Sequence, residues 1–175
     1  MKKDILIYIL LALILAFGIY QYSSRPNIAC VQLGKVYDEF EMKKQLEGKY
    51  KNISNARKVQ LDSLELHLKA LSNIIVSMNE KDPLRQEKIN EFEYKKQDYL
   101  QKKKTFGEDN QQTSKMYEEE VWKQLNQYIT DYGKEKGYTC VLGANGTGAV
   151  MYIQQSSDVT DAVITYVNNK FKGLK

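Results

Sequence analysis

Strand-like sequence occurs in two widely separated places in this chain. Asn27 to Leu33 reads NIACVQL, Tyr138 to Ile153 reads YTCVLGANGTGAVMYI, and the residues between them follow a helical pattern. A short strand is not stable alone, so the two segments must meet in one sheet. The intervening chain must therefore run out and return, which predicts a long helical hairpin joined to a small sheet-containing head.

The chain begins with an apolar run that follows a basic start. Ile5 to Tyr20 contains no charged or amide side chain, and two lysines precede it. This length lies between that of a signal-peptide core and that of a full membrane span. Tyr20 and Tyr22 suit a membrane interface. We expect residues 5–22 to be an uncleaved anchor to the inner membrane with the remainder exported; removal as a signal peptide is the alternative.

The outgoing helix has an apolar stripe typical of a coiled coil. From about Met42 to Met78 the apolar residues alternate steps of three and four. They are Leu46, Tyr50, Ile53, Leu61, Leu64, Leu68, Leu71, Ile75 and Met78. Asn79 to Pro83 is the strong helix-breaking segment, because the residue before a proline avoids α-helical backbone dihedral angles. The chain is therefore expected to reverse near residues 79–83.

The returning helix, from about Leu84 to Lys136, has a sparser stripe. Phe92, Tyr99 and Phe106 recur every seven residues. Residues 101–115 are polar and include a glycine, which costs about 1 kcal/mol relative to alanine inside a helix. This stretch is predicted to bend or fray.

The end of the chain supplies the rest of the head. Asn145-Gly146 is a strong hairpin-turn signal, so Ala149 to Ile153 is predicted as a third strand. Asp158 to Asp161 then begins an amphipathic helix that Asp158 or Thr160 can cap. The predicted class is α+β, mostly α. Its parts are an N-terminal segment and linker (1–26), a head (27–41 and 137–175) and a hairpin arm (42–136).

The two cysteines lie in the two strand segments. Cys30 and Cys140 could form a disulfide in an exported protein, but two cysteines make no framework pattern. We favour the interpretation that both are small buried residues.

Charge and motifs argue against nucleic-acid binding and catalysis. Residues 35–82 hold nine basic and eight acidic side chains, and residues 84–136 hold eleven of each. Such mixed charge is typical of solvated helix faces. His67 is the only histidine and has no clustered metal-ligand partners. Without a nucleophile motif or phosphate loop, we expect no enzyme activity, no cofactor and no small-molecule substrate.

Motifs at both ends of the chain carry a family resemblance. They are Ile28 to Tyr37 (IACVQLGKVY), Gly137 to Leu142, Val150 to Tyr152 and Ser157 to Asp161 (SDVTD), on either side of a long helical hairpin. Together they resemble the Skp/OmpH family of periplasmic chaperones. The resemblance implies a homotrimer with a central β body, whose helical hairpins enclose a cavity that holds unfolded outer-membrane proteins without nucleotide.

Two features depart from that family. The resembled chaperones have a cleavable signal, whereas this chain looks tethered. They also tend to be strongly positive, whereas this hairpin is nearly balanced in charge. Free diffusion and electrostatic attraction of acidic clients are therefore not expected here.

Two sets of residues are candidates for function. Client contact is predicted for Ile74, Ile75, Val76, Met78 and Leu84 near the reversal, and for Phe92, Tyr99 and Phe106 on the returning helix. The head core and trimer contact are predicted to use Ile28, Cys30, Val31, Val141, Leu142, Val150, Tyr152 and Val163. The alternative for the first set is that these side chains only pack the two helices together. The resulting hypothesis is an ATP-independent holdase; the alternative is a tethered coiled-coil scaffold with one defined partner.

Overall fold

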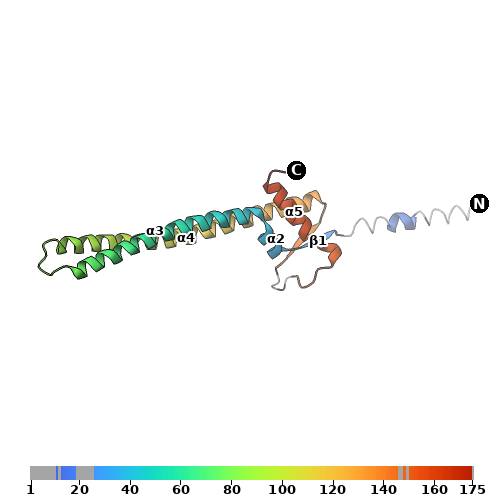
Figure 1. The fold of residues 1–175 in the computed structure, drawn as a ribbon. Coiled ribbons are helices and arrows are strands. Elements are labelled where there is room, and N and C mark those ends of the chain that lie inside the picture. Colours follow the sequence, from blue (N-terminus) through green and yellow to red (C-terminus); the bar gives the residue numbers. More distant parts are fainter. Residues whose placement is uncertain (1–10, 12, 19–25, 146–147, 149, 175) are drawn as a thin grey trace, which may run out of the picture. The chain divides into compact units, whose positions relative to one another are not determined.

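The computed structural model describes residues 11, 13–18, 26–145, 148 and 150–174, and it is mostly helical. Its elements are β1 (Ile28–Gln32), α2 (Leu33–Glu39), α3 (Glu41–Ser77), α4 (Arg85–Glu135), β2 (Cys140–Ala144), the 3-10 helix η1 (Gln155–Ser157) and α5 (Thr160–Phe171) (Figure 1). They divide into two compact units. The sheet unit comprises the described parts of residues 1–36 and 126–175, and the hairpin unit comprises residues 37–125.

The hairpin unit pairs α3 with the first part of α4. The side chains of the predicted seam on α3 are half-buried from Leu61 to Met78, as expected where one helix packs on another. The Arg57 guanidinium lies 3.2 Å from the Asp109 carboxylate, and the Tyr99 hydroxyl donates to Glu65 at 3.5 Å. From Arg57 to Glu65 the partner on α4 moves back from Asp109 to Tyr99, so the two helices run antiparallel and the predicted hairpin is present.

The reversal between the helices is built from asparagine and aspartate side chains. The Asn79 side chain accepts a hydrogen bond from the Lys81 backbone N–H at 3.0 Å. Asp82 accepts one from the Leu84 backbone N–H at 2.9 Å, just before α4 begins. These local hydrogen bonds satisfy backbone N–H groups of the turn, which lie outside both helices and have no helical partner. The reversal predicted near residues 79–83 is confirmed.

Helix α4 continues without interruption through Gly107. The break or fraying predicted for residues 101–115 is not found. The neighbouring side chains explain the difference, because Arg57 bonds to Asp109 and lies 5.5 Å from the centroid of the Phe106 ring. These contacts from α3 hold the helix together against the small cost of one glycine.

The sheet consists of two parallel strands in the described residues. β1 pairs with β2 in a register that runs from Ile28 opposite Cys140 to Gln32 opposite Ala144. Parallel strands need a long crossover, which the helices between them supply. The central residues of β1 are buried, and the Cys30 carbonyl accepts a hydrogen bond from Val159 at 2.9 Å on the edge away from β2. The predicted covering of this strand is confirmed. Its central position is not, because β1 has a strand only on the β2 side and a single bridge, Cys30 to Asp158, on the other.

The predicted third strand is not found. Residues 150–153 have no strand pairing, and Met151 and Tyr152 are more than four-fifths exposed. The turn predicted at Asn145-Gly146 lies partly outside the described residues. After β2 the chain next bonds to β1 near Asp158, at the opposite edge of β1. Residues 150–153 therefore span the distance between these edges and do not pair with β2.

The cysteines differ from the prediction in one respect. Cys30 is buried as expected, but Cys140 is exposed, and both are free thiols. The register places Cys30 opposite Leu142 and Cys140 opposite Ile28. An offset of two residues corresponds to roughly 6.6 Å along the strands and 4.8 Å across them. The resulting distance between the two Cα atoms, about 8 Å, exceeds the Cα–Cα distance of roughly 7 Å that a disulfide can span.

Helix α5 closes the sheet unit. Val163 and Val167 are fully buried, as the amphipathic pattern predicts. The Asp158 carboxylate accepts hydrogen bonds from both the backbone N–H, at 2.9 Å, and the hydroxyl of Thr160. The N-cap position itself is occupied by Val159, whose side chain makes no cap bond, so Asp158 caps the helix from the residue before it, and Thr160 is the first residue of the helix.

Most of the N-terminal apolar run lies outside the described residues. Leu11 and residues 13–18 are helical, and their side chains are exposed. Within the described part of the chain, no helix combines the length and the apolar character needed to cross a membrane.

Candidate functional site

The five candidate residues near the reversal fall into two groups. Ile75 and Met78 are half-buried and continue the α3 seam. Ile74, Val76 and Leu84 are exposed by 46%, 81% and 57%. Exposed aliphatic side chains are candidates for contact with another molecule. This second group, which we call the tip residues, is therefore the part of the prediction that can contact another molecule.

The three candidate aromatic residues of α4 have a different environment. Each ring is half-buried and has a basic side chain over its face. The cation lies 5.8 Å from the ring centroid for Lys96 over Phe92, 5.7 Å for Lys103 over Tyr99 and 5.5 Å for Arg57 over Phe106. A cation–π contact at a partly exposed site contributes about 0.5–1 kcal/mol. A client would have to displace these side chains to stack on the rings.

Sequence reasoning missed a second set of exposed apolar residues. Val59 and Leu66 are each about two-thirds exposed on α3. Seven residues correspond to nearly two turns, so both side chains point in almost the same direction, away from the seam of Leu61, Leu64 and Leu68. Their spacing of seven is the signal that could have revealed them. On α4, Tyr94, Leu100 and Met116 are also exposed.

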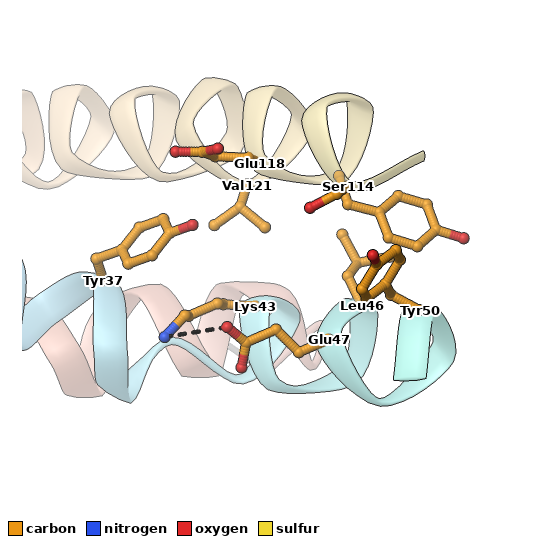
Figure 2. A pocket seen from close by; sticks show the side chains of 9 residues that line it. Tyr37, Lys43, Leu46, Glu47, Tyr50, Ser114, Glu118 and Val121 are labelled. Atoms are coloured by element: carbon orange, nitrogen blue, oxygen red, sulfur yellow. Dashed lines mark ion pairs between the residues drawn. The ribbon is translucent and has the colours of Figure 1, made fainter. Parts of the chain in front are cut away.

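The hairpin unit also contains a pocket that the sequence did not indicate (Figure 2). Its cavity volume is about 180 Å³, and it is lined by Tyr37, Lys43, Leu46, Glu47, Tyr50, Ser114, Tyr117, Glu118 and Val121. We call it the tyrosine pocket. These residues come from α2, α3 and α4, so no local sequence pattern could have brought them together.

Ion pairs and ring contacts fix one side of the tyrosine pocket. Lys43 pairs with Asp38 at 2.9 Å and with Glu47 at 3.3 Å, the latter drawn in Figure 2. The hydrogen bond to Asp38 raises the pKa of Lys43 above its usual value. The Tyr37 ring stacks on Trp122 with 4.5 Å between centroids. Burial raises the pKa of Tyr37, and the nearby Glu118 charge adds to the effect. Lys43 therefore stays charged and Tyr37 stays neutral at physiological pH.

The candidate residues of the head divide by exposure. Cys30, Val31 and Val163 belong to the buried core of the sheet unit. Val141 and Val150 are half-buried. Ile28, Leu142 and Tyr152 are exposed in the single chain. Their burial between chains of a trimer stays a prediction.

The described residues offer contact surfaces and no metal centre. Within this part of the chain, no group of three or more His, Cys, Asp or Glu side chains is placed to hold a metal ion.

Comparison with known proteins identifies the family. No curated protein sequence matches this chain. A solved structure from Caulobacter crescentus CB15, of a protein assigned as an OmpH-like outer membrane chaperone, matches with a TM-score of 0.70 and 15% identity, over 87% of this chain and 89% of that one. At this identity the match establishes a shared fold. The family model for outer membrane protein (OmpH-like) matches residues 27–167, so this chain belongs to the OmpH-like family.

Proposed function

We propose that this protein is an ATP-independent holdase for unfolded outer-membrane proteins in the bacterial periplasm. Membership of the OmpH-like family supports this class of function. The observation that carries the proposal is the exposure of Ile74, Val76 and Leu84 next to the reversal of the helical hairpin.

The exposed aliphatic groups are suited to weak and reversible binding. An unfolded β-barrel chain presents apolar side chains that have no sheet to enter, and covering such surface is favourable by about 25 cal/mol per Å². A few side chains on each hairpin would give modest affinity, and several hairpins together would raise it through effective concentration. A client held in this way could be released without nucleotide hydrolysis.

The proposal includes a homotrimer. A two-stranded sheet, followed by the exposed side chains of Met151 and Tyr152, is a small core, and unpaired strand edges favour partners. Native mass spectrometry of the chain without its first 25 residues should give a trimer. A stable monomer would contradict this part of the proposal.

The tip residues provide the direct test of client binding. In a light-scattering assay with an outer-membrane protein diluted from urea, Val76→Ser combined with Leu84→Ser should require roughly two- to tenfold more chaperone to suppress aggregation, since apolar contact surface is lost. Lys81→Ser is the control, because Lys81 is exposed and lies in the turn between α3 and α4, between the two substituted positions in the sequence. Equal suppression by both variants would argue against client contact at the tip.

The number of different clients that the protein binds distinguishes the holdase function from the scaffold alternative. Suppression of aggregation for several unrelated β-barrel proteins is expected. Tight binding to one folded partner, with no suppression for the others, would favour the scaffold.

The location is part of the proposal. Family membership supports the periplasm, and residues 5–22 are the tether in our interpretation. Intact mass of the protein extracted from cells, combined with alkaline washing of the membranes, tests this directly. A mature chain that lacks these residues and appears in the wash would replace the tether with a cleaved signal.

A further inference from the structure

The side of α3 that faces away from the seam carries no charged residue over most of the helix. Steps of three or four residues keep side chains on one side of a helix. The residues that share this side are all exposed and uncharged: Asn52, Asn55, Val59, Ser63, Leu66, Ala70, Asn73 and Ser77. We call them the amide face. It is a continuous surface that the pairing of α3 with α4 leaves open.

The amide face combines two kinds of group. Val59 and Leu66 lie near its middle, and each is about two-thirds exposed. Asn52, Asn55 and Asn73 lie on either side of them, and within the described part of the chain their side chains make no hydrogen bond. An asparagine amide offers two N–H donors and a carbonyl acceptor. The face therefore offers apolar contact together with unpaired amide groups.

An unfolded chain has the groups that match these amides. Its backbone N–H and C=O groups are unpaired, whereas those of a folded protein are satisfied in helices and sheets. A side-chain amide can pair with both groups of one open peptide unit. From Asn52 to Asn73 the helix rises about 32 Å, which is the length of about ten residues of extended chain. The dimensions and the chemistry of the face thus fit an extended segment.

Charge narrows the choice of occupant. A segment with uncharged side chains meets no unpaired charge on this face. A second copy fits less well, because an antiparallel pair of α3 helices with Val59 opposite Leu66 would place each Asp62 beside the Asp62 of the other copy. Like charges at a two-fold contact repel on both sides. The unfolded, uncharged segment is therefore the favoured occupant.

We propose that the amide face binds an extended, uncharged segment of an unfolded client through its backbone. This inference rests on the proposed holdase function and names the chemical feature that the hairpin recognises. The asparagine amides pair with open backbone N–H and C=O groups, and small apolar side chains of the client lie on Val59 and Leu66. Recognition of this kind does not depend on the sequence of the client.

A pair of peptides tests recognition of the backbone. The probe is a blocked ten-residue peptide of Gly, Ser, Thr and Val. Titrating it into the full chain labelled with ¹⁵N should shift the side-chain NH₂ signals of Asn52, Asn55 and Asn73 with a Kd on the order of 1 mM. The same peptide with every second backbone nitrogen methylated keeps its side chains but loses those N–H donors. It should bind at least fivefold more weakly.

Two double variants locate the effect. Asn52→Ala combined with Asn55→Ala should weaken binding about three- to fivefold, as expected for the loss of two hydrogen bonds, with the Asn73 signal as the readout. Gln97→Ala combined with Gln101→Ala removes two exposed amides from α4 and should leave binding unchanged. Alanine is the better helix former at all four positions, so neither variant should lower the thermal midpoint.

The outcomes separate this inference from the proposed function. Equal binding of the two peptides, or equal effects of the two double variants, overturns the amide face even if the chain still suppresses client aggregation. The expected differences, in a chain that fails to suppress aggregation, support the amide face and contradict the holdase function. If the asparagine signals shift as the chain is concentrated without peptide, and peptide causes no further change, the occupant is a second copy and the proposal is wrong.

Discussion

At the scale of single residues, Asp158 links two elements of the sheet unit. Its carboxylate accepts from the backbone N–H and hydroxyl of Thr160 and from the Gln32 side chain at 3.0 Å. Thr160 is itself buried, and its hydroxyl accepts from the Gln32 backbone N–H at 2.9 Å. One aspartate therefore joins the start of α5 to the end of β1.

Removing this carboxylate should destabilise the sheet unit. Asp158→Ala is expected to lower the free energy of local opening, measured by amide hydrogen exchange in α5, by about 1 kcal/mol, as for other lost helix caps. Asp161→Ala, which removes only an exposed ion pair with Lys35 at 2.8 Å, should cost less. Equal losses in the two variants would mean that the cap is not the source of the stability.

The same residue predicts a dependence on pH. Hydrogen bonds from the Thr160 hydroxyl and then from its backbone N–H lower the pKa of Asp158. Because folding lowers the pKa of Asp158, its ionised carboxylate stabilises the folded state at pH values above the unfolded-state pKa, about 3.9. This stability is lost as the pH falls through the pKa of the folded state. The stability difference between the parent chain and Asp158→Ala should therefore be full at neutral pH and shrink below about pH 4. A difference that does not change with pH would contradict this assignment.

At the scale of elements, α4 shows how contacts between helices override local preference. Gly107 lies inside a continuous helix, and an added Cβ there would meet no atom within 4 Å. Gly137, just after the helix, has a φ of 69°, which only glycine adopts readily.

These two glycines predict opposite effects of alanine. Gly107→Ala should raise the free energy of unfolding of the hairpin unit by up to about 1 kcal/mol, since alanine is the better helix former. Gly137→Ala should lower the stability of the sheet unit, because a side chain is strained at positive φ. Hydrogen exchange with residue-level resolution measures both. A destabilised Gly107→Ala variant would show that the glycine is needed in α4.

The packing of the hairpin unit is also uneven along its length. Phe40, Val121 and Leu125 are almost completely buried, whereas the seam farther along α3 is only half-buried. Stability of the pair of helices should therefore be concentrated where these three residues lie.

Two leucine variants measure this difference. Leu125→Ala should cost about 2–5 kcal/mol of unfolding free energy, because it removes a fully buried side chain. Leu66→Ala, at a position 69% exposed, should change it by less than about 0.5 kcal/mol. Chemical denaturation followed by circular dichroism gives both values. Similar costs for both would mean that Leu66 is covered in solution.

At the scale of the whole molecule, the exposed segment after β2 is the feature that a single chain leaves unexplained. Met151 and Tyr152 are large side chains and are among the most exposed of the described residues. In the proposed trimer they would pack against neighbouring copies.

A charge at this position tests the assembly. Tyr152→Asp should dissociate the proposed trimer, because a buried unpaired carboxylate is unfavourable. Tyr94→Asp, at a ring 75% exposed in the hairpin unit, should leave the assembly intact. Sedimentation velocity of both variants at the same concentration measures their oligomeric state. A trimer in both cases would place the contact elsewhere.

The separated strand segments, the apolar stripe of α3 and the breaker before Pro83 allowed much of the fold to be predicted. Each is a local or periodic pattern that one sequence displays directly. The sequence did not predict that residues 150–153 would lack a strand partner or that Cys140 would be exposed. Pairing register and strand order depend on competition between distant segments for the same edge, which no local pattern encodes.

The candidate site was predictable only in part. The apolar tip near Ile74 and Leu84 was predictable, because apolar residues are concentrated in the sequence on both sides of the predicted turn. The Arg57 cation over Phe106 and the tyrosine pocket were not, because they require residues from different helices to be in register. Lys96 over Phe92 and Lys103 over Tyr99 are pairs four residues apart on α4, a spacing that the sequence displays directly.

The sequence by itself determined that this chain doubles back, where it reverses and which end motifs resemble the OmpH-like family, since these depend on spacing along one chain. Only the tertiary structure decided that the two strands run parallel, that α4 is continuous and that Tyr50, Tyr117 and Glu118 share one cavity. The physical reason is that burial and ion pairing between distant residues depend on how helices and strands pack, which periodicity alone does not specify.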